Sequence, residues 1–573
     1  MMNQSTAGAA TASQTGPISD RTQVRQRYTF EGFTAGPTWA ARLMIRPMKH
    51  TLLSLLALAL FAATDYETEG RRWWSHIQTL ADDNMQGRNT GSEGHRKAAA
   101  YVAGEFERAG LKPAGTSGYM QPVKFDVVEI NEGQSSVALV RDGKAEALKL
   151  GEDAIVSLRG DTVPHTEAGA VFAGYGMKVP EANWDDFAGL DLKGKVVVML
   201  AGGPKSIPGP LKSHYQSAGM RWGQLKAAGA IGIANIPNPK SMDIPWPRMS
   251  LARFQPSMSL ADRSLKETLG MQLGLTINPG HANKFFVGSG HTIAEILAAA
   301  DNDKPLPHFA LKPSIRADVK LNHSQVESPN VVGMLPGSDP ALKNEYVVLS
   351  SHLDHVGVGQ PINGDAIYNG AMDDASGVAT VLEVARMIKE RGLHPKRSLL
   401  FMTVTAEEKG LLGSRYFATH PTVNRKNIVA DVNLDMFLPL HKLEYLEVQG
   451  LDESSLGDEI RAVAATAGVK VQADKEPQRN LFIRSDQYNF IREGIPALAF
   501  KFGYLPGSPE EKLHKDWLRD RYHAPSDDLK QPVDKAAAAR FNEIILELTE
   551  RIADGAERPR WKPNSFFRRF AAE

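Results

Sequence analysis

The 573-residue sequence contains no cysteine. Disulfide bonds, thiolate metal sites, cysteine nucleophiles and lipid attachment through cysteine are therefore excluded. Any bound metal ion must be held by histidine and carboxylate side chains. The chain also lacks a net charge, because 66 Lys and Arg residues balance 66 Asp and Glu residues. Its overall charge therefore offers no attraction to nucleic acid or to an acidic membrane, and we predict no nucleic-acid partner.

Long apolar runs are scarce as well, and one stands out near the N-terminus. Residues 52–63 are apolar, with Arg46, Lys49 and His50 before them and small residues at their end. About a dozen apolar residues are too few to span a bilayer comfortably, and the pattern is that of a secretory signal. A short buried helix is the alternative.

We therefore assign residues 1–64 to an upstream extension plus a signal peptide at about 44–64. An arginine-bearing segment precedes the signal, so Met44 or Met48 is the expected initiator. The chain is predicted to be exported, to the periplasm or the extracellular space. No other segment is apolar enough to span a membrane, so no stable membrane span is expected after signal cleavage.

A chain of this length is expected to form more than one domain. Residues 65–118 are predicted to be a helical N-terminal part of a catalytic domain, because 98–111 repeats apolar residues at helical spacing and contains a glycine stop. Over 119–325, short strand-like runs such as VKFDVVEI and KVVVML are divided by Gly, Pro and Asp. This texture predicts a separate, inserted β-rich domain.

Residues 326–556 alternate between strand-like and helix-like segments, and residues 557–573 are assigned to a C-terminal tail. Strands are expected at 346–351, 398–405, 428–436 and 497–502, and helices at 377–391, 411–419, 456–467 and 535–552. Such alternation predicts an α/β fold, with a mixed, largely parallel sheet sandwiched by helices. Ligands bind beyond the carboxyl ends of the strands in sheets of this kind.

Acidic and histidine side chains gather in four motifs after these expected strands, and a fifth motif with a tyrosine and a histidine lies in a loop near the C-terminus. The motifs are SSHLDHVG with His352, Asp354 and His355, GAMDDASG with Asp373 and Asp374, TAEEKGLLGS with Glu407 and Glu408, NLDM with Asp435, and RYHAPSDD with Tyr522 and His523. Each motif alone has an ordinary explanation: loop histidines are often solvated, and acidic residues before a helix commonly cap it. At one sheet edge, however, these carboxylates would repel one another unless bound cations compensated them. Nitrogen and oxygen donors without sulfur favour zinc, with manganese or cobalt as substitutes.

In this order, the five motifs resemble those of the two-zinc aminopeptidases and related exopeptidases of peptidase family M28. The segments GAVFAGYG, WDDFAGLDLKGKVVVML and QLKAAGAIGIANI resemble a protease-associated (PA) domain. The likeness covers about residues 73–556. It implies a zinc exopeptidase fold of the phosphorylase/hydrolase-like type, an M28-type catalytic domain over 326–556, a PA-like insert over 119–325, and two Zn²⁺ per chain.

The resemblance also implies a ligand set. His352, Asp373 and Asp435 would bind one ion, and Asp373, Glu408 and His523 would bind the other, so that Asp373 bridges the two.

Further roles follow from the same resemblance. The Asp354 carboxylate would orient the His352 imidazole, and Asp374 would position the backbone beside a cis Asp373–Asp374 peptide. Glu407 would act as the general base toward a metal-activated water. Tyr522 would donate to the developing oxyanion.

Other polar residues are assigned less directly. Many relatives carry Ser-Asp-His where this chain has RSDQYNF, which makes Asp486 and Gln487 candidate substrate contacts, with a structural salt bridge as the alternative for Asp486. The remaining polar residues fall in two groups: the candidates for the pocket rim, for which a solvated position is favoured, are His355, His514 and Arg484, and the turn or capping residues are Asp527 and Asp528.

The predicted function is that of a metallo-aminopeptidase that hydrolyses the N-terminal peptide bond of peptides and proteins. A carboxypeptidase, a dipeptidase or another amide hydrolase on the same scaffold is the alternative. A catalytically silent PA-type binding protein is disfavoured, because all five implied ligands, Glu407 and Tyr522 are present. The oligomeric state is not predicted.

Overall fold

A mixed ten-stranded sheet contains all the strands expected from the alternating pattern. The computed structural model describes residues 64–571 except Asn480, so the predicted signal segment lies outside the described residues apart from Thr64. The strands of this first sheet are β1 (Lys112–Pro113), β2 (Met120–Ile130), β11 (Ser257–Leu260), β14 (Leu321–Leu335), β15 (Tyr346–His352), β18 (Ser398–Val404), β19 (Ile428–Asn433), β20 (Tyr445–Gln449), β21 (Lys470–Ala473) and β22 (Ala497–Gly503). Their order is β11-β2-β14-β18-β15-β19-β22-β20-β21, and β1 pairs with β14.

The centre of the first sheet is parallel. Strand β15 pairs in parallel with β18 and β19, and β19 pairs in parallel with β22. The flanks are antiparallel at β2, β14 and β20. The predicted α/β class is therefore confirmed, with the parallel character confined to the four central strands and to the edge pair β20–β21.

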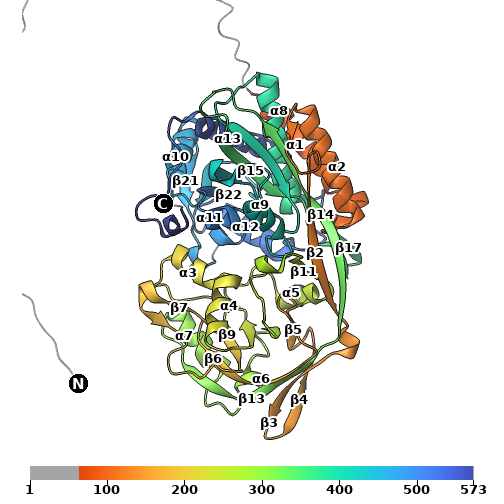
Figure 1. The fold of residues 1–573 in the computed structure, drawn as a ribbon, viewed down its shortest axis with the longest axis vertical. Coiled ribbons are helices and arrows are strands. Elements are labelled where there is room, and N and C mark those ends of the chain that lie inside the picture. Colours follow the sequence, from red (N-terminus) through yellow and green to blue (C-terminus); the bar gives the residue numbers. More distant parts are fainter. Residues whose placement is uncertain (1–63, 480, 572–573) are drawn as a thin grey trace, which may run out of the picture. The chain divides into compact units, whose positions relative to one another are not determined.

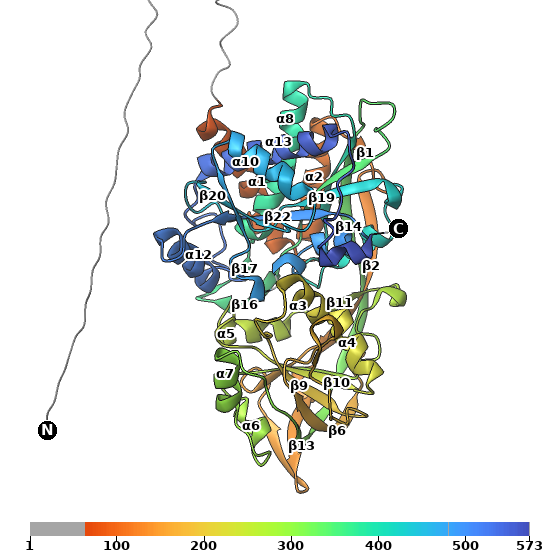
Figure 2. The same cartoon turned by 90° about the vertical axis from the view of Figure 1, so that its left-hand side faces the viewer.

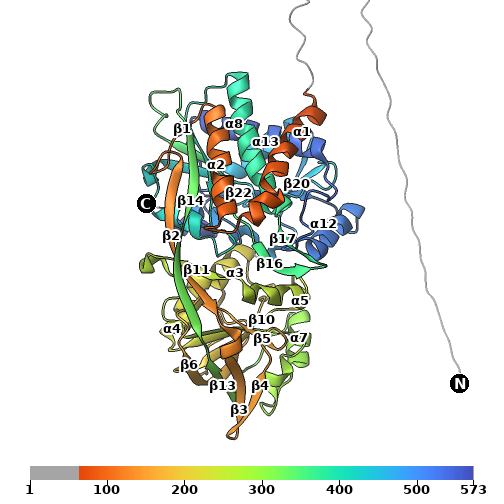
Figure 3. The same ribbon diagram turned by 90° about the vertical axis from the view of Figure 1, so that its right-hand side faces the viewer.

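Helices cover both faces of this sheet, as predicted (Figures 1 and 3). The helices are α1 (Tyr66–Leu80), α2 (Glu93–Arg108), α8 (Ser376–Arg391), α9 (Leu412–Thr419), α10 (Leu456–Thr466), α11 (Gln487–Arg492), α12 (Pro509–Asp520) and α13 (Lys535–Asp554). Alternate residues of β18 face opposite sides: Leu399 and Phe401 pack with α1, α2, α8 and α13, whereas Leu400 and Met402 pack with α9 and α11. This period of two in a fully buried strand produces the three-layer arrangement.

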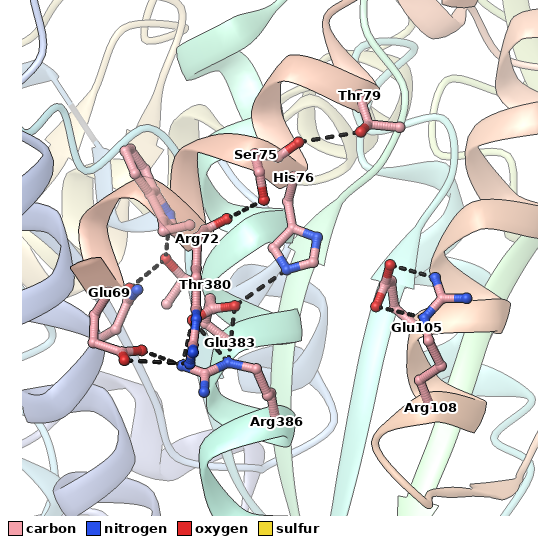
Figure 4. Close-up of polar contacts among 12 residues, drawn as sticks. Glu69, Arg72, Ser75, His76, Thr79, Glu105, Arg108, Thr380, Glu383 and Arg386 are labelled. Atoms are coloured by element: carbon pink, nitrogen blue, oxygen red, sulfur yellow. Dashed lines mark hydrogen bonds and ion pairs between the residues drawn. The ribbon is translucent and has the colours of Figure 1, made fainter. Parts of the chain in front are cut away.

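A polar cluster connects helices α1 and α8, which pack on the same face of the first sheet (Figure 4). The Glu383 carboxylate lies 3.2 Å from Nε2 of His76 and 2.7 Å from Nη2 of Arg386. Arg386 also pairs with Glu69 on α1. Because the Glu383 side chain is 2 % exposed, its charge depends on these two partners rather than on water.

An eight-stranded second sheet lies within residues 136–318 (Figure 2). Its strands are β3 (Ser136–Arg141), β4 (Lys144–Leu148), β5 (Ala154–Val156), β6 (His165–Ala173), β9 (Val196–Leu200), β10 (Gly232–Ile236), β12 (Leu273–Ile277) and β13 (His308–Asp318). The helices of this region are α3 (Gly209–Gln216), α4 (Ala218–Ala227), α5 (Trp246–Met249), α6 (Asn283–Phe286) and α7 (Ile293–Asp301). Two short hairpins complete the strands: β7 (Lys178–Val179) with β8 (Trp184–Asp185), and β16 (Gly357–Ile362) with β17 (Asp365–Tyr368).

The second sheet falls inside the range predicted for the inserted domain and has its own apolar core. Strands β2 and β11 come from the same range, yet they pair in the first sheet. Among the described residues, no helix combines the length and the apolar character that crossing a membrane requires.

Candidate metal centre and active site

The candidate site forms at the carboxyl ends of three central strands. His352 is the last residue of β15, Glu407 and Glu408 follow β18, and Asp435 follows β19. Because these strands are parallel neighbours, their carboxyl ends meet at one edge.

The backbone beside these residues adopts left-handed conformations. Ala406 has φ of 58°, Met436 of 48° and His523 of 49°. Such values are uncommon outside glycine, and they cluster where a site needs side chains aimed in unusual directions. Ala406 precedes the candidate base Glu407, Met436 follows the predicted ligand Asp435, and His523 is itself a predicted ligand.

Asp373 lies between the two groups of predicted ligands. On one side, Nε2 of His352 is 3.2 Å from Asp373 Oδ1 and 3.7 Å from Asp435 Oδ1. On the other side, Nε2 of His523 is 3.3 Å from Asp373 Oδ2 and 3.1 Å from Glu408 Oε2. The five predicted ligands are thus brought together in the expected two groups, with Asp373 common to both.

His355 belongs to this cluster rather than to a solvated rim, which corrects the sequence-based placement. The ring is fully buried, and its Nδ1 lies 2.8 Å from Glu408 Oε1 and 3.8 Å from Asp373 Oδ2. Room for the ring depends on Gly370, where a Cβ would come within 2.5 Å of the imidazole. Since Gly370 is distant in sequence from His355, no local pattern reports this burial.

Asp374 contacts the backbone, as predicted. Its carboxylate accepts hydrogen bonds from the amides of Gly377 at 3.0 Å, Met436 at 3.2 Å and His352 at 3.4 Å. The Asp373–Asp374 peptide is cis, as the family resemblance implied. Asp374 thereby ties three segments of the site together.

Asp354 differs from the prediction in the atom that it uses. The backbone carbonyl of Asp354, not its carboxylate, meets Nδ1 of His352 at 3.0 Å. The carboxylate instead accepts from the Glu407 amide and from the Thr90 hydroxyl, both at 3.0 Å. The segment after β15 directs the carbonyl at the ring, so the side chain is free to fix the start of the Glu407 loop.

Two further buried residues position this site, and sequence reasoning missed both. Asp527, assigned to a turn, accepts from the amides of Met372 at 2.9 Å and Asp373 at 3.0 Å. Arg88 donates to the carbonyl oxygens of Leu353 and Gly370, both at 2.9 Å, and to those of Leu80 and Asn369. For Asp527, the sequence signal was its position in the motif that contains His523. For Arg88, the signal was a charged residue in a glycine-rich loop.

The electrostatics of the cluster call for positive charge. Burial would lower the pKa of His352, but Glu407 and Asp373 outweigh it and raise that pKa well above its ordinary value. Burial likewise opposes protonation of His523, yet Glu408 and Asp373 raise its pKa strongly. Burial, opposed by His352 but reinforced by neighbouring carboxylates, raises the pKa of Glu407 well above its usual range.

The residues present fit divalent metal ions. Asp373 Oδ2 and Glu408 Oε1 are buried without a hydrogen-bond partner among the described residues, although imidazoles lie within ion-pair distance. Two sets of closely spaced donor atoms occur here, one in His352, Asp374 and Asp435 and one in His355, Asp373 and Glu408. Imidazole and carboxylate donors around uncompensated charge suit zinc.

Two cavities adjoin the cluster. The first cavity, of about 90 Å³, is lined by Glu407, Asp373, Asp435, Tyr522 and His523, and also by the predicted residues Gln487, Arg484 and His514. The second cavity, of about 440 Å³, is lined by Glu408, Lys409 and His523 together with residues 155–159 and 244–258. His523 lines both cavities, so the candidate site borders each of them.

The remaining candidate residues divide between cavity and core. Burial raises the pKa of Tyr522 well above its usual value, so its hydroxyl stays protonated as a donor. Arg484 pairs with Asp243 at 2.8 Å. Gln487 accepts a hydrogen bond from Asn433 at 2.8 Å. Asp486 is fully buried and lines neither cavity, which differs from the substrate contact predicted for it, and burial raises its pKa to about 7.

Known proteins resemble this chain in sequence and in fold. Residues 330–549 match the family model described as "Peptidase family M28". Carboxypeptidase Q of Xenopus laevis is 34 % identical over 122 residues, which is 21 % of this chain and 24 % of that protein. Leupeptin-inactivating enzyme 1 of Streptomyces exfoliatus is 31 % identical over 169 residues, which is 29 % of this chain and 34 % of that protein. The matched segments thus span about a quarter to a third of these two relatives.

A solved structure extends the likeness beyond this segment. The aminopeptidase from Aneurinibacillus sp. strain AM-1 superposes with a TM-score of 0.52 at 20 % identity, covering 85 % of this chain and 95 % of that one. At this identity the match establishes the fold.

Proposed function

We propose that this chain, whose residues 330–549 belong to peptidase family M28, is a metal-dependent exopeptidase that removes the N-terminal residue of peptides. The observation that carries this proposal is the position of Asp373 between two groups of imidazole and carboxylate donors, beside a cavity that Glu407 lines. Such a cluster is a common basis of amide hydrolysis by activated water.

The ligand set proposed for two zinc ions is His352, Asp373 and Asp435 for one, and Asp373, Glu408 and His523 for the other. His355 is a further donor at the second ion, because it reaches the same two carboxylates. Bound zinc supplies a lowered pKa for water and polarisation of the scissile carbonyl.

The chain's own groups then move the protons. Glu407 accepts the proton of the attacking water, and it later passes that proton to the leaving amine. The Tyr522 hydroxyl donates a hydrogen bond toward the carbonyl oxygen as negative charge develops there. Asp354 holds the Glu407 amide, which fixes where the base stands.

The carboxylates of the first cavity support the preference for a free α-amino group. Glu407, Asp435 and Glu447 all line it, and an ammonium group is stabilised by such neighbours. A carboxypeptidase or dipeptidase is the second candidate, because the relatives include proteins named carboxypeptidase Q.

Two further properties belong to this proposal. We propose that the second sheet is a PA-like domain, on the segments GAVFAGYG and QLKAAGAIGIANI. We also propose export to the periplasm or the extracellular space, on the signal-like residues 44–64.

A panel of peptides tests the function. Free and N-acetylated versions of the same peptides are assayed before chelation, after chelation and after zinc is returned. Hydrolysis confined to free N-termini, abolished by the chelator and restored by zinc, is the expected result. Equal cleavage of the acetylated peptides would exclude an aminopeptidase, and activity that resists chelation would exclude a metal-dependent one.

A further inference from the structure

The second cavity is lined by cations, in contrast to the first. Its charged lining residues are Arg159, Arg248, Arg253 and Lys409, with Glu408 as the one carboxylate. Glu408 is already engaged by His355 and His523. The lining thus carries an excess of positive charge that Glu408 does not balance.

Only one of these cations has a carboxylate partner of its own. Arg253 pairs with Glu132 at 3.1 Å. Arg248 donates to the carbonyl oxygen of Leu518 at 3.1 Å, and Asp520 acts on its charge without forming an ion pair among the described residues. In the part of the chain that the structure describes, neither Arg159 nor Lys409 forms an ion pair, although Asp354 and Glu408 act on Lys409 at longer range and Arg159 lies near it. Neighbouring cations without a counter-charge favour a bound anion.

The first cavity has the opposite excess. The carboxylates in its lining are Asp243, Asp373, Glu407, Asp435, Glu447 and Glu476, and the cations are Arg479, Arg484 and Lys501. His523 lines both cavities, and the candidate base Glu407 faces the first. The lining thus changes from mainly carboxylates in the first cavity to mainly cations in the second. Within the first cavity, Asp243 is paired with Arg479 and Arg484, and Asp373 and Asp435 are proposed metal ligands.

A short peptide at neutral pH has the same polarity, with an ammonium group at one end and a carboxylate at the other. With its amino end in the first cavity, its chain crosses the cluster and its carboxyl end enters the second. We propose that the second cavity is a subsite for the C-terminal carboxylate of short peptides, with Arg159 and Lys409 as the groups that bind it. This inference rests on the proposed function and narrows its substrates to short peptides with both ends free.

In this proposal, residues 136–318 contribute to substrate selection. Arg159, Arg248 and the apolar residues beside them come from that region, whereas Lys409 and Tyr368 come from the segments around the first sheet. The subsite is thus completed by two parts of the chain that are far apart in sequence. A carboxylate bound there would be held at a fixed distance from Glu407, which favours short chains over long ones.

The test compares one tripeptide, Leu-Gly-Gly, as the free acid and as the C-terminal carboxamide. The zinc-loaded full chain should hydrolyse the free acid with a kcat/KM at least about ten-fold higher, because a charge-assisted contact to a carboxylate is lost in the amide. Arg159→Gln and Lys409→Gln should each lower the acid-to-carboxamide ratio of kcat/KM by about ten-fold. Lys193→Gln is the matched control: Lys193 is an exposed cation of the same region that lines neither cavity, so the ratio should not change.

The outcomes separate this inference from the function on which it rests. Equal, chelator-sensitive hydrolysis of the acid and the carboxamide overturns the subsite and leaves the exopeptidase intact. A ratio that is unchanged in both Arg159→Gln and Lys409→Gln, at unchanged zinc content, likewise overturns the subsite. Absence of chelator-sensitive hydrolysis of either peptide, while zinc is bound, overturns the proposed function itself.

Discussion

Glu407 and Glu408 are consecutive residues whose side chains enter different cavities. Glu407 lines the first cavity, and Glu408 lines the second, where its Oε2 lies 3.1 Å from Nε2 of His523. The left-handed backbone of Ala406 and the hydrogen bond from the Glu407 amide to Asp354 fix this divergence. Two chemically identical groups can therefore serve as base and as ligand.

Replacing Glu407 separates these two roles. Glu407→Gln should lower kcat by about 10²- to 10⁴-fold, because the amide cannot accept a proton, while the content of bound zinc stays unchanged. Steady-state kinetics and metal analysis of the same sample measure both quantities. Glu408→Gln is the matched change, and it should instead lower zinc content. A Glu407→Gln enzyme with near-normal kcat would refute the role of Glu407 as base.

Asp527 provides a test of how the central ligand is held. Its carboxylate accepts from the amides of Met372 and Asp373, so Asp527→Asn should misplace Asp373 and weaken zinc binding by about 10- to 100-fold. Competition with a chelator of known affinity measures the change. Asp528→Asn is the neighbouring control, because the Asp528 carboxylate accepts from the Lys530 amide in a more exposed turn and makes no contact with the segment of Asp373 among the described residues. Equal zinc affinities for the two variants would contradict a positioning role for Asp527.

Much of the central architecture could be predicted because its signals are local. Strands β15, β18, β19 and β22 are rich in apolar residues, and each begins at the residue expected from the sequence. His352 and Asp435 stand at or just beyond the ends of such runs, so strand pairing alone places them at one edge. The predicted position of the ligand cluster follows from this placement of His352 and Asp435.

The supporting residues could not be predicted because their contacts are long-range. Arg88 reaches the carbonyl oxygen of Leu353 across 265 positions of sequence. The burial of His355 depends on the missing Cβ of Gly370. Strand β2 pairs over its whole length with β14, although nothing in either segment shows that they join the first sheet rather than the second. These features arise from packing rather than from any pattern along the chain.

Replacing Arg88 tests how much such long-range contacts contribute to the stability of the fold. Arg88→Met should lower the free energy of unfolding by about 3–5 kcal/mol, because four buried carbonyl oxygens from three segments lose their donor. Urea denaturation at saturating zinc measures it. Arg72→Met removes a guanidinium that is 48 % exposed and should cost less than about 1 kcal/mol. Similar losses in the two variants would show that the carbonyl contacts of Arg88 contribute little.

The Glu383 cluster between α1 and α8 predicts a dependence of stability on pH. Burial raises the pKa of Glu383, but His76 and Arg386 outweigh it, and the pKa lies below its ordinary value of 4.5. A carboxyl group whose pKa is depressed in the folded state stabilises the fold above the unfolded-state pKa and loses that contribution as pH falls. Glu383→Gln should therefore lower the free energy of unfolding by about 1–3 kcal/mol at pH 7, and by progressively less below about pH 4.5.

An exposed pair separates this effect from ordinary surface electrostatics. Glu105 pairs with Arg108 one turn away on α2, and the Arg108 side chain is 64 % exposed (Figure 4). Water and salt screen such a pair, so Glu105→Gln should cost less than about 1 kcal/mol at any pH. Denaturation curves of the two variants and the wild type at pH 7, 5 and 4 make the comparison. Protonation removes the charge of Glu383 but leaves its packing unchanged. If the loss of stability in Glu383→Gln did not shrink as the pH fell, Glu383 would therefore stabilise the fold through packing and not through its charge.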